Sequence, residues 1–230
     1  MCIRDSAGTL QLGAANALAS STAVTVASGA TFNLNNYSST IGSLAGAGTV
    51  TLGNRTLVAG GNNTSTTFSG AFTSGDTGTF EKTGTGTLTL GSGLNLSGGN
   101  LVLSGGTLNL GGFNSTFNSL AVTANSIIDF GSGAGSILNI LGANSVSIAA
   151  GVTLTIANWT DTVDYFYSLV NPGSTTLGQI AFTGFSASGT KWQSFDHQIT
   201  PVPEPSTYGA ALMLLGLSLG VWRCRRRRAA

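Results

Sequence analysis

Few side chains in this 230-residue chain could support acid–base or metal chemistry. His197 is the only histidine, and no His/Cys cluster has the make-up of a zinc or copper site. Asp161 and Asp164 are a lone acidic pair, whereas a calcium-dependent lyase needs more carboxylates and a Lys or Arg base in the same groove. Residues 87–128 contain no charged residue at all. We therefore expect no catalytic residue, no cofactor and no bound metal, and we assign the Asp161/Asp164 segment to a solvated loop.

Residues 201–230 have a more specific pattern, in three parts. The first part, 201–206, is rich in proline, which fixes φ and lacks an N–H, so this hinge should be extended and exposed. The second part, 207–222, is apolar and uncharged and predicts a single transmembrane helix. The third part, 223–230, is a basic tail that the positive-inside rule places in the cytoplasm through Arg223, Arg225, Arg226, Arg227 and Arg228. The chain before Pro201 would then lie on the other side of the membrane.

Together the three parts resemble the PEP-CTERM sorting signal of Gram-negative envelope proteins. The resemblance rests on Val202, Pro203, Glu204, Pro205 and Ser206, followed by the apolar run and the terminal arginines. It implies an exosortase as partner, a membrane protease that cuts near Pro-Glu-Pro and passes the body onward. It also implies a cell-envelope location, with a precursor transiently anchored in the inner membrane and a mature form at the outer surface or outside the cell. The alternative is an ordinary single-pass anchor that is never cut.

The composition of the chain agrees with export. Only 7% of its residues are charged, far from the roughly 25% of ordinary soluble domains. Between residues 7 and 202, three basic residues stand against six acidic ones, a net charge of −3. Nucleic-acid binding needs clustered Lys and Arg for phosphate contacts, so we exclude nucleic acid as a partner. This part of the chain has no cysteine and must be held by packing and hydrogen bonds.

The first six residues do not fit the pattern that follows them. Residues 1–6 resemble the translated sequencing-adapter stub found at the front of metagenomic gene predictions, and we leave them out of the fold prediction. No basic segment leads into an apolar run near this end, although the tail requires export. We expect the chain to be a fragment whose true N-terminus and signal peptide are missing.

Residues 7–157 repeat a short strand and a glycine-rich turn. Apolar and polar residues alternate along each strand, which indicates one buried face. The first leucines of four successive strands are at positions 88, 94, 101 and 108. Three strands therefore fill about twenty residues before the pattern repeats. Three short strands per turn predict a right-handed parallel β-helix, or β-solenoid, with rungs about 4.8 Å apart. We expect Thr89, Asn95 and Val102 to face outward. Expected inward residues include Leu10/Leu12, Val24/Val26, Phe32/Leu34, Val50/Leu52, Leu88/Leu90, Leu94/Leu96, Leu101/Leu103, Ile127, Phe130, Leu138/Ile140, Val146/Ile148 and Leu154/Ile156.

The segment 78–90, with the Leu-rich Gly-Gly turns after it, resembles the autotransporter-associated β-strand repeat. The resemblance is good over residues 43–112 and looser outside them. In that family the repeats are parallel β-helix coils of surface-exposed passenger regions, so the resemblance implies architecture and no chemistry. The alternative is an antiparallel sandwich or meander, because Gly-Gly and Ser-Gly turns also suit hairpins. A sandwich, however, does not explain why the sequence pattern repeats about every twenty residues.

Residues 158–200 differ from the repeats, because most of the remaining large aromatic residues gather there. A solenoid needs an atypical end piece over its last open rung, and bulky aromatic residues can provide one, so we expect a C-terminal aromatic cap. The alternative is a sugar-binding platform, in which Trp159, Tyr165, Tyr167 or Trp192 would contact a glycan.

The sequence therefore predicts an exported all-β protein, a capped β-solenoid followed by one transmembrane helix, that is not an enzyme. Its expected role is structural or adhesive, at the cell surface or in the extracellular matrix, with exopolysaccharide or other surface proteins as partners besides the exosortase. The alternative function is that of a polysaccharide-binding or polysaccharide-lyase-like β-helix protein.

Overall fold

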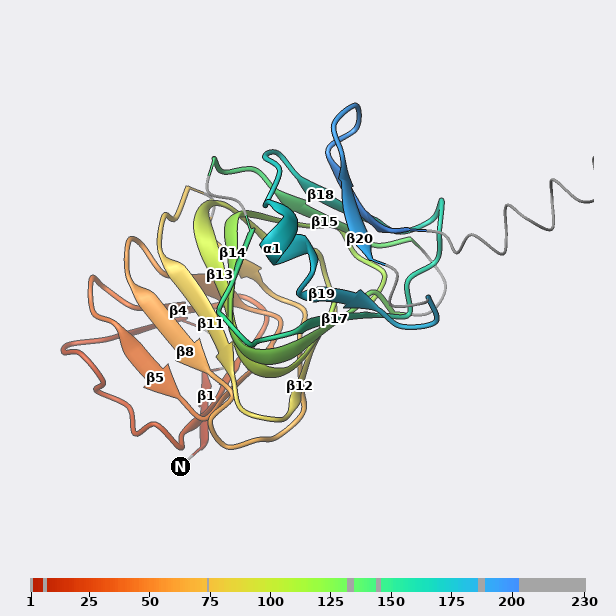
Figure 1. Cartoon of the computed structure of the whole chain (residues 1–230). Helices are drawn as coiled ribbons and strands as arrows, with labels where there is room; N and C mark the ends of the chain where they lie inside the picture. The colour runs from red at the N-terminus through yellow and green to blue at the C-terminus, as the bar shows by residue number, and fades with distance from the viewer. Residues whose placement is uncertain are drawn as a thin grey trace, which may run out of the picture.

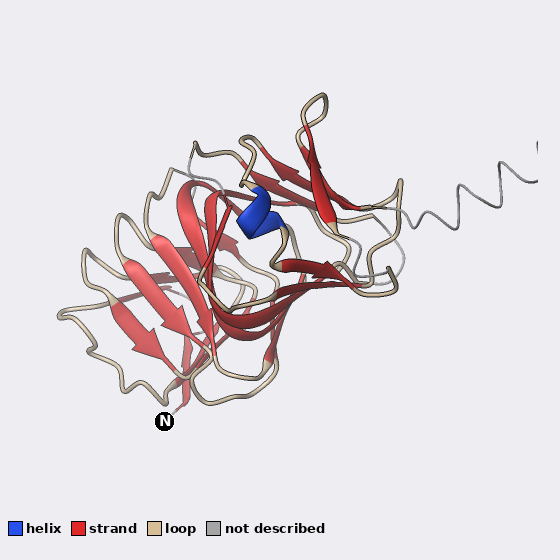
Figure 2. Cartoon of the chain, in the orientation of Figure 1, coloured by secondary structure: helices blue, strands red, loops and turns tan. Residues whose placement is uncertain are grey.

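A computed structural model describes residues 2–5, 8–73, 75–131, 135–143, 146–185 and 189–202. Regular structure in this part of the chain is almost entirely β-strand, with one short helix, α1 (Ser174–Leu177) (Figure 2). The strands form a β-solenoid of about eight turns. In Figure 1 the coil advances from the red N-terminal strands to the blue C-terminal end. The predicted all-β solenoid is confirmed.

Each turn places short strands on three faces, which we call A, B and C and which the chain visits in the order C, B, A. Face C contains β2 (Gly8–Gln11), β4 (Ala30–Asn33), β7 (Thr49–Thr51), β10 (Ala71–Phe72), β15 (Ile137–Ile140) and β18 (Tyr165–Ser168). Face B contains β5 (Ser39–Ile41), β8 (Thr56–Ala59), β11 (Thr79–Thr83) and β16 (Val146–Ile148). Face A contains β1 (Cys2–Asp5), β3 (Ala23–Val26), β6 (Ser43–Gly46), β9 (Thr66–Phe68), β12 (Thr87–Leu90), β17 (Leu154–Ala157) and β19 (Ile180–Phe182). The long strands β13 (Asn95–Asn109) and β14 (Ser115–Asp129) each bend around all three faces.

Successive turns pair in parallel. On face A, Leu88 of β12 pairs with Leu108 of β13, and Leu108 pairs with Ile128 of β14. On face B, Phe80 of β11 pairs with Leu101 of β13. Each partner lies about one predicted repeat further along the chain. The antiparallel alternative is therefore wrong for the repeats, because every strand pair among them is parallel.

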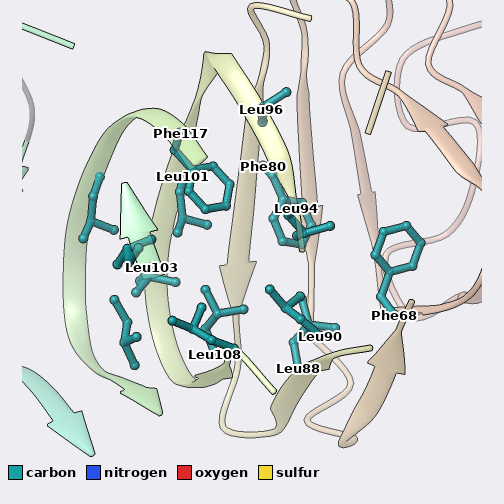
Figure 3. Packing of buried hydrophobic residues seen from close by; sticks show 14 of the residues in the cluster. Phe68, Phe80, Leu88, Leu90, Leu94, Leu96, Leu101, Leu103, Leu108 and Phe117 are labelled. Carbon is teal, nitrogen blue, oxygen red and sulfur yellow. The ribbon is translucent and has the colours of Figure 1, made fainter. Parts of the chain in front are cut away.

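The inward side chains of the three faces form one apolar core. The predicted pairs Leu88/Leu90, Leu94/Leu96 and Leu101/Leu103 are all buried, and Figure 3 shows them gathered inside the coil with Phe68, Phe80 and Phe117. Thr89, Asn95 and Val102 are exposed or half-buried, as predicted. Burying a leucine or phenylalanine side chain contributes roughly 1.5–3 kcal/mol, so a core of this kind can hold the coil without disulfides. The predicted inward and outward positions are confirmed for this stretch.

One inward assignment is wrong. Ile127 was expected inside, but its side chain is 37% exposed, while Ile128 is fully buried. From Leu120 to Phe130 the buried residues all fall on even-numbered positions: Leu120, Val122, Ser126, Ile128 and Phe130. Because Ile127 and Ile128 are equally apolar, the sequence alone does not show which of them keeps the alternation.

A close approach between turns explains why glycine is needed at one corner. Gly46 has a φ of 102° and stacks on Val26 of the previous turn. A Cβ atom at Gly46 would lie 2.0 Å from the carbonyl oxygen of Val26. Any other residue would therefore force the two turns apart and would also strain its own backbone.

The coil ends in an antiparallel hairpin. After β18 on face C, α1 takes the place of a face B strand, and β19 continues face A. The chain then forms β20 (Thr190–Gln193) and β21 (Gln198–Pro201), which pair antiparallel with each other. β21 also meets β18 in antiparallel orientation. The parallel stack therefore ends on a strand of opposite direction.

The N-terminal segment that was left out of the fold prediction takes part in face A. β1 pairs in parallel with β3 along its whole length. This pairing is a property of the backbone and does not test the origin of residues 1–6, which stays a prediction.

Replacing Leu101 by aspartate should destabilise the fold far more than replacing Thr89 by aspartate. Leu101 is fully buried between turns, so an unpaired carboxylate there should lower the free energy of unfolding by several kcal/mol, on the order of 3 or more. Thr89 is half-buried on the outer side of β12, where the same new charge should cost about 1 kcal/mol or less. Denaturant unfolding followed by circular dichroism measures both. Equal losses in the two variants would show that the inward face is wrongly assigned.

Candidate sorting junction at the end of the solenoid

The predicted sorting motif begins in the last strand of the folded body. All four residues of β21 are buried. The strand pairs with β20 from Gln198 opposite Gln193 to Pro201 opposite Thr190. On its other side, Gln198 lies opposite Tyr167 of β18. β21 is therefore held by neighbouring strands on both sides.

The ordered hydrogen bonds continue one residue past β21. The Val202 amide donates a hydrogen bond to the Gly189 carbonyl oxygen over 2.9 Å. We expected an exposed hinge from Pro201 onward, but Pro201 is buried as the last residue of the strand. A proline is tolerated at this end of the hairpin because it needs to donate no ladder hydrogen bond there. The folded body thus extends to Val202.

The remaining C-terminal predictions fall on residues that the structure does not describe. These are residues 203–206 of the motif, the expected transmembrane helix 207–222 and the basic tail 223–230. Within the described ranges, no helix has the length and apolar character needed to cross a membrane.

Trp192 fastens the β20–β21 hairpin to the solenoid. Its indole N–H donates to the carbonyl oxygen of Ser168, at the end of β18, over 2.9 Å. Its ring stacks on His197, with the ring centroids 5.6 Å apart and the planes at 20°. His197 lies in the hairpin turn with a φ of 60°. Both side chains therefore serve the packing of the hairpin, and the His197 ring covers one face of Trp192.

Trp159 is part of the core. Its side chain is 7% exposed and lies between Phe130 and Phe182, with edge-to-face ring contacts at centroid distances of 5.0 and 5.1 Å. Glycan contact by Trp159 stays a prediction, and the two rings that cover its side chain count against it. Trp159 joins the last turns of the coil.

Tyr165 and Tyr167, which were also expected to contact a glycan, are half-exposed on the outer side of β18, and Trp192 on β20 is half-exposed as well. Their rings are parallel, at 3°, with centroids 5.5 Å apart. The Tyr165 hydroxyl donates to the carbonyl oxygen of Thr162 over 3.0 Å. Burial, then the neighbouring Tyr165 and Asp196, raise the pKa of Tyr167 above its ordinary value. The Tyr167 hydroxyl therefore keeps its proton at physiological pH.

The acidic pair does not form one solvated loop as expected. Asp161 is exposed, but Asp164 is buried at 3% exposure. The Asp164 carboxylate accepts backbone hydrogen bonds from Ser136, 2.8 Å, and Thr160, 2.7 Å. Asp164 therefore ties neighbouring turns together. Among the residues that the structure describes, no group of three or more His, Cys, Asp and Glu could hold a metal ion.

Lys82 is one of the three basic residues of the body, and its side chain is buried. Its side chain is 3% exposed and points into the coil. The Nζ atom donates to the carbonyl oxygens of Thr83, Gly84 and Gly105, at 3.1, 3.3 and 3.1 Å. Gly105 belongs to the next turn, so Lys82 connects two turns at one corner. Burial lowers the pKa of Lys82 to about 8.

The alternation of β11 contains the signal that would have identified this lysine. Phe80 faces inward, so the residue two positions later must face inward as well. Ala59, the partner of Lys82 in the previous turn, is small and buried, and leaves room for the long side chain. The alternation of inward and outward residues along β11 therefore predicts that Lys82 faces inward.

Comparison with known proteins gives one match. Residues 201–228 match the family model described as the PEP-CTERM protein-sorting motif. No curated protein and no solved structure matches the chain. The matched segment starts at the last residue of β21 and so overlaps the folded body by two described residues. The motif indicates exosortase-dependent export of a surface protein.

The burial of Lys82 should make stability depend on pH in a defined direction. The unfolded chain keeps the Lys82 proton up to about pH 10.5, while the folded chain releases it above about pH 8. Between these values the unfolded state binds more protons, so the free energy of unfolding should rise with pH, by roughly 1 to 3 kcal/mol.

Denaturant titrations of the wild type and Lys82→Met between pH 7 and 10.5 measure this contribution. The wild type should gain stability relative to Lys82→Met as the pH rises, while the exposed control Lys191→Met should follow the wild type. Identical pH profiles for wild type and Lys82→Met would contradict the lowered pKa.

Proposed function

We propose that this chain is an exosortase-sorted protein of the cell surface or extracellular matrix, with a structural or adhesive role and no catalytic one. The observation that carries the proposal is the position of the sorting motif. The match to residues 201–228 begins where β21 closes the folded body. The folded body is thus followed directly by the sorting motif.

The body has the physical properties of a rigid spacer. Its parallel turns stack into a coil of about eight turns, with apolar side chains inside and mainly Ser, Thr, Asn and Gly outside. Such a stack grows by adding turns without changing its cross-section. The resemblance of residues 78–90 to the autotransporter-associated repeat supports a surface location, and the handedness rule for parallel crossovers supports a right-handed coil.

The proposal places the precursor in the inner membrane. Residues 207–222 would span the bilayer and the five arginines would remain in the cytoplasm. Only five residues lie between Val202 and Tyr208, the first large side chain of the apolar run. The six fully extended steps from Val202 to Tyr208 span about 20 Å, so the end of the solenoid stays close to the membrane surface until the chain is cut.

An adhesive contact would most readily involve the same end of the coil. Phe195, in the turn between β20 and β21, is 82% exposed, and Tyr165 and Tyr167 are half-exposed on β18. Aromatic rings of this kind can stack on sugars or pack against other proteins. Retention of the purified protein on exopolysaccharide would support adhesion, and its absence would leave the role of a scaffold.

Replacing Pro203, Glu204 and Pro205 by alanine should stop sorting while leaving the anchor intact. The substitution removes the extended, N–H-poor segment that a protease can recognise, but keeps the apolar run and the arginines. The variant should accumulate uncut in the inner membrane of a host that contains an exosortase. Pro172→Ala, a proline substitution in the body, is the matched control and should be sorted normally.

Mass spectrometry of the C-terminus of surface material measures the outcome. The mature wild-type protein should lack Trp222 and the arginine cluster. Surface protein that still carries Trp222 would show that the tail is an ordinary membrane anchor that is not cut.

A further inference from the structure

Exposed apolar side chains gather at the C-terminal end of the coil, at the corner that joins face C to face B. Leu169 and Val170 follow β18 at this corner and are 49% and 40% exposed. The Leu169 amide donates to the Ile140 carbonyl oxygen over 3.0 Å, so Leu169 lies over Leu141, which is 47% exposed. Apolar side chains of two neighbouring turns thus form one exposed strip.

The β20–β21 hairpin adds a further apolar side chain beside this corner. The Ser168 amide donates to the His197 carbonyl oxygen over 2.9 Å, and the Trp192 indole donates to the Ser168 carbonyl oxygen, so the hairpin turn is held next to the end of β18. Phe195 lies in that turn and is 82% exposed. Figure 1 shows the hairpin standing out from the blue end of the coil. We call the following four residues the end patch: Leu141, Leu169, Val170 and Phe195.

The chemistry of the end patch differs from that of the outer surface of the coil, which is mainly Ser, Thr, Asn and Gly. Apolar residues that are exposed singly are ordinary, but neighbouring ones mark a contact with a protein or a membrane. None of the four side chains carries a charge, and Asp196, next to Phe195, is acidic. The body as a whole has a net charge of −3 between residues 7 and 202. A contact made by the end patch is therefore apolar, and electrostatic attraction to anionic groups contributes nothing to it.

The size of the end patch favours a bilayer over a second folded protein. A stable protein interface buries about 800 Å² on each partner and involves roughly 20 to 30 residues a side. The end patch offers only four apolar side chains. A contact with lipid can be weaker, because a tether in the same membrane keeps the patch at a high local concentration near it. Phenylalanine and leucine are also side chains that enter the boundary between lipid headgroups and acyl chains.

The start of the tail brings the end patch within reach of the bilayer. Val202 pairs with Gly189 at the opposite end of the hairpin from Phe195. Because the two hairpin strands are four residues long, Val202 and Phe195 lie roughly 20 Å apart. The extended steps from Val202 to Tyr208 span a similar distance, about 20 Å. The coil can therefore tilt about its tether until the end patch meets the lipid.

We propose that the end patch rests on the membrane surface while the chain is tethered, with the Phe195 side chain in the interfacial layer and the earlier turns of the coil standing in solvent. This inference rests on the proposed sorting function, which places the body at a bilayer. The contact orients the coil with its C-terminal end toward the membrane. Without the tether, four apolar side chains make only a weak, reversible contact, so the body can leave the membrane once the tail is cut.

Site-specific fluorescence in vesicles tests the inference. The full chain, with Cys2→Ser and Cys224→Ser, is reconstituted into vesicles of phosphatidylethanolamine and phosphatidylglycerol. The variant Phe195→Cys carries the environment-sensitive dye NBD, which nitroxide-labelled lipid quenches on contact. Tyr37→Cys with the same dye is the matched control. Tyr37 is also exposed, at 38%, and also lies between a face C and a face B strand, but several turns further from the tether.

The nitroxide lipid should quench the dye at position 195 several-fold more than the dye at position 37. High salt should not reverse this difference, because the contact is apolar. Leu141→Ser combined with Leu169→Ser should lower the quenching at position 195 toward the level at position 37. Both leucines are exposed, so the circular dichroism of the double variant should match that of the wild type.

Equal quenching at positions 195 and 37 would overturn the inference. A blue-shifted dye at position 195 that the nitroxide lipid does not quench would overturn it as well, because protein, such as a second copy of the chain, would then cover the end patch. Flotation of the vesicles separates these results from a failure of the proposed function. A full chain that does not float with the vesicles would overturn the proposed tether, and this inference with it.

Discussion

Every turn of this coil must place its apolar side chains directly over those of the turn before it, and the rest of the structure depends on that stacking. Parallel pairing aligns Leu88, Leu108 and Ile128 in one inward column, and Phe80 with Leu101 in another. The same pairing satisfies the backbone hydrogen bonds of the strands, so register and core packing are one constraint. With no cysteine between residues 7 and 202, these two contributions must hold the body together.

The stacking also explains why glycine and a buried lysine occur at the corners of the coil. Turns that lie this close leave no room for side chains at some corners, so Gly46 sits against the Val26 carbonyl, and Lys82 fills another corner by donating to three carbonyl groups. A parallel stack has no internal reason to stop, so its last strand would remain open to pairing. The antiparallel strand β21 covers β18, and the sorting motif begins in that closing strand. The strand that closes the fold therefore contains the first residue of the sorting motif.

Much of this could be read from the sequence, because period-two alternation and glycine-rich turns are local signals. They identified three strands per turn and the inward leucines, and the Pro-Glu-Pro tail was recognisable as a motif. Other features depend on long-range contacts that leave no local signal. Ile127 and Ile128 are equivalent by type, Trp159 differs from a surface aromatic only through Phe130 and Phe182, and the burial of Pro201 requires β20 as a partner. The inward position of Lys82 follows locally from its alternation with Phe80, but one of its carbonyl partners, Gly105, comes from the next turn.

The central claim is that neighbouring turns stack in parallel, and a pair of cross-linking variants tests it most directly. Thr89 pairs with Asn109 of the next turn, so Thr89→Cys with Asn109→Cys should form a disulfide when Cys2 and Cys224 are replaced by serine. In an antiparallel meander, the turn at 91–93 would instead place Thr89 opposite Asn95. The measurement is the yield of each disulfide by mass spectrometry under mild oxidation. The solenoid predicts a high yield for 89/109 and little for 89/95, and the reverse result would contradict it.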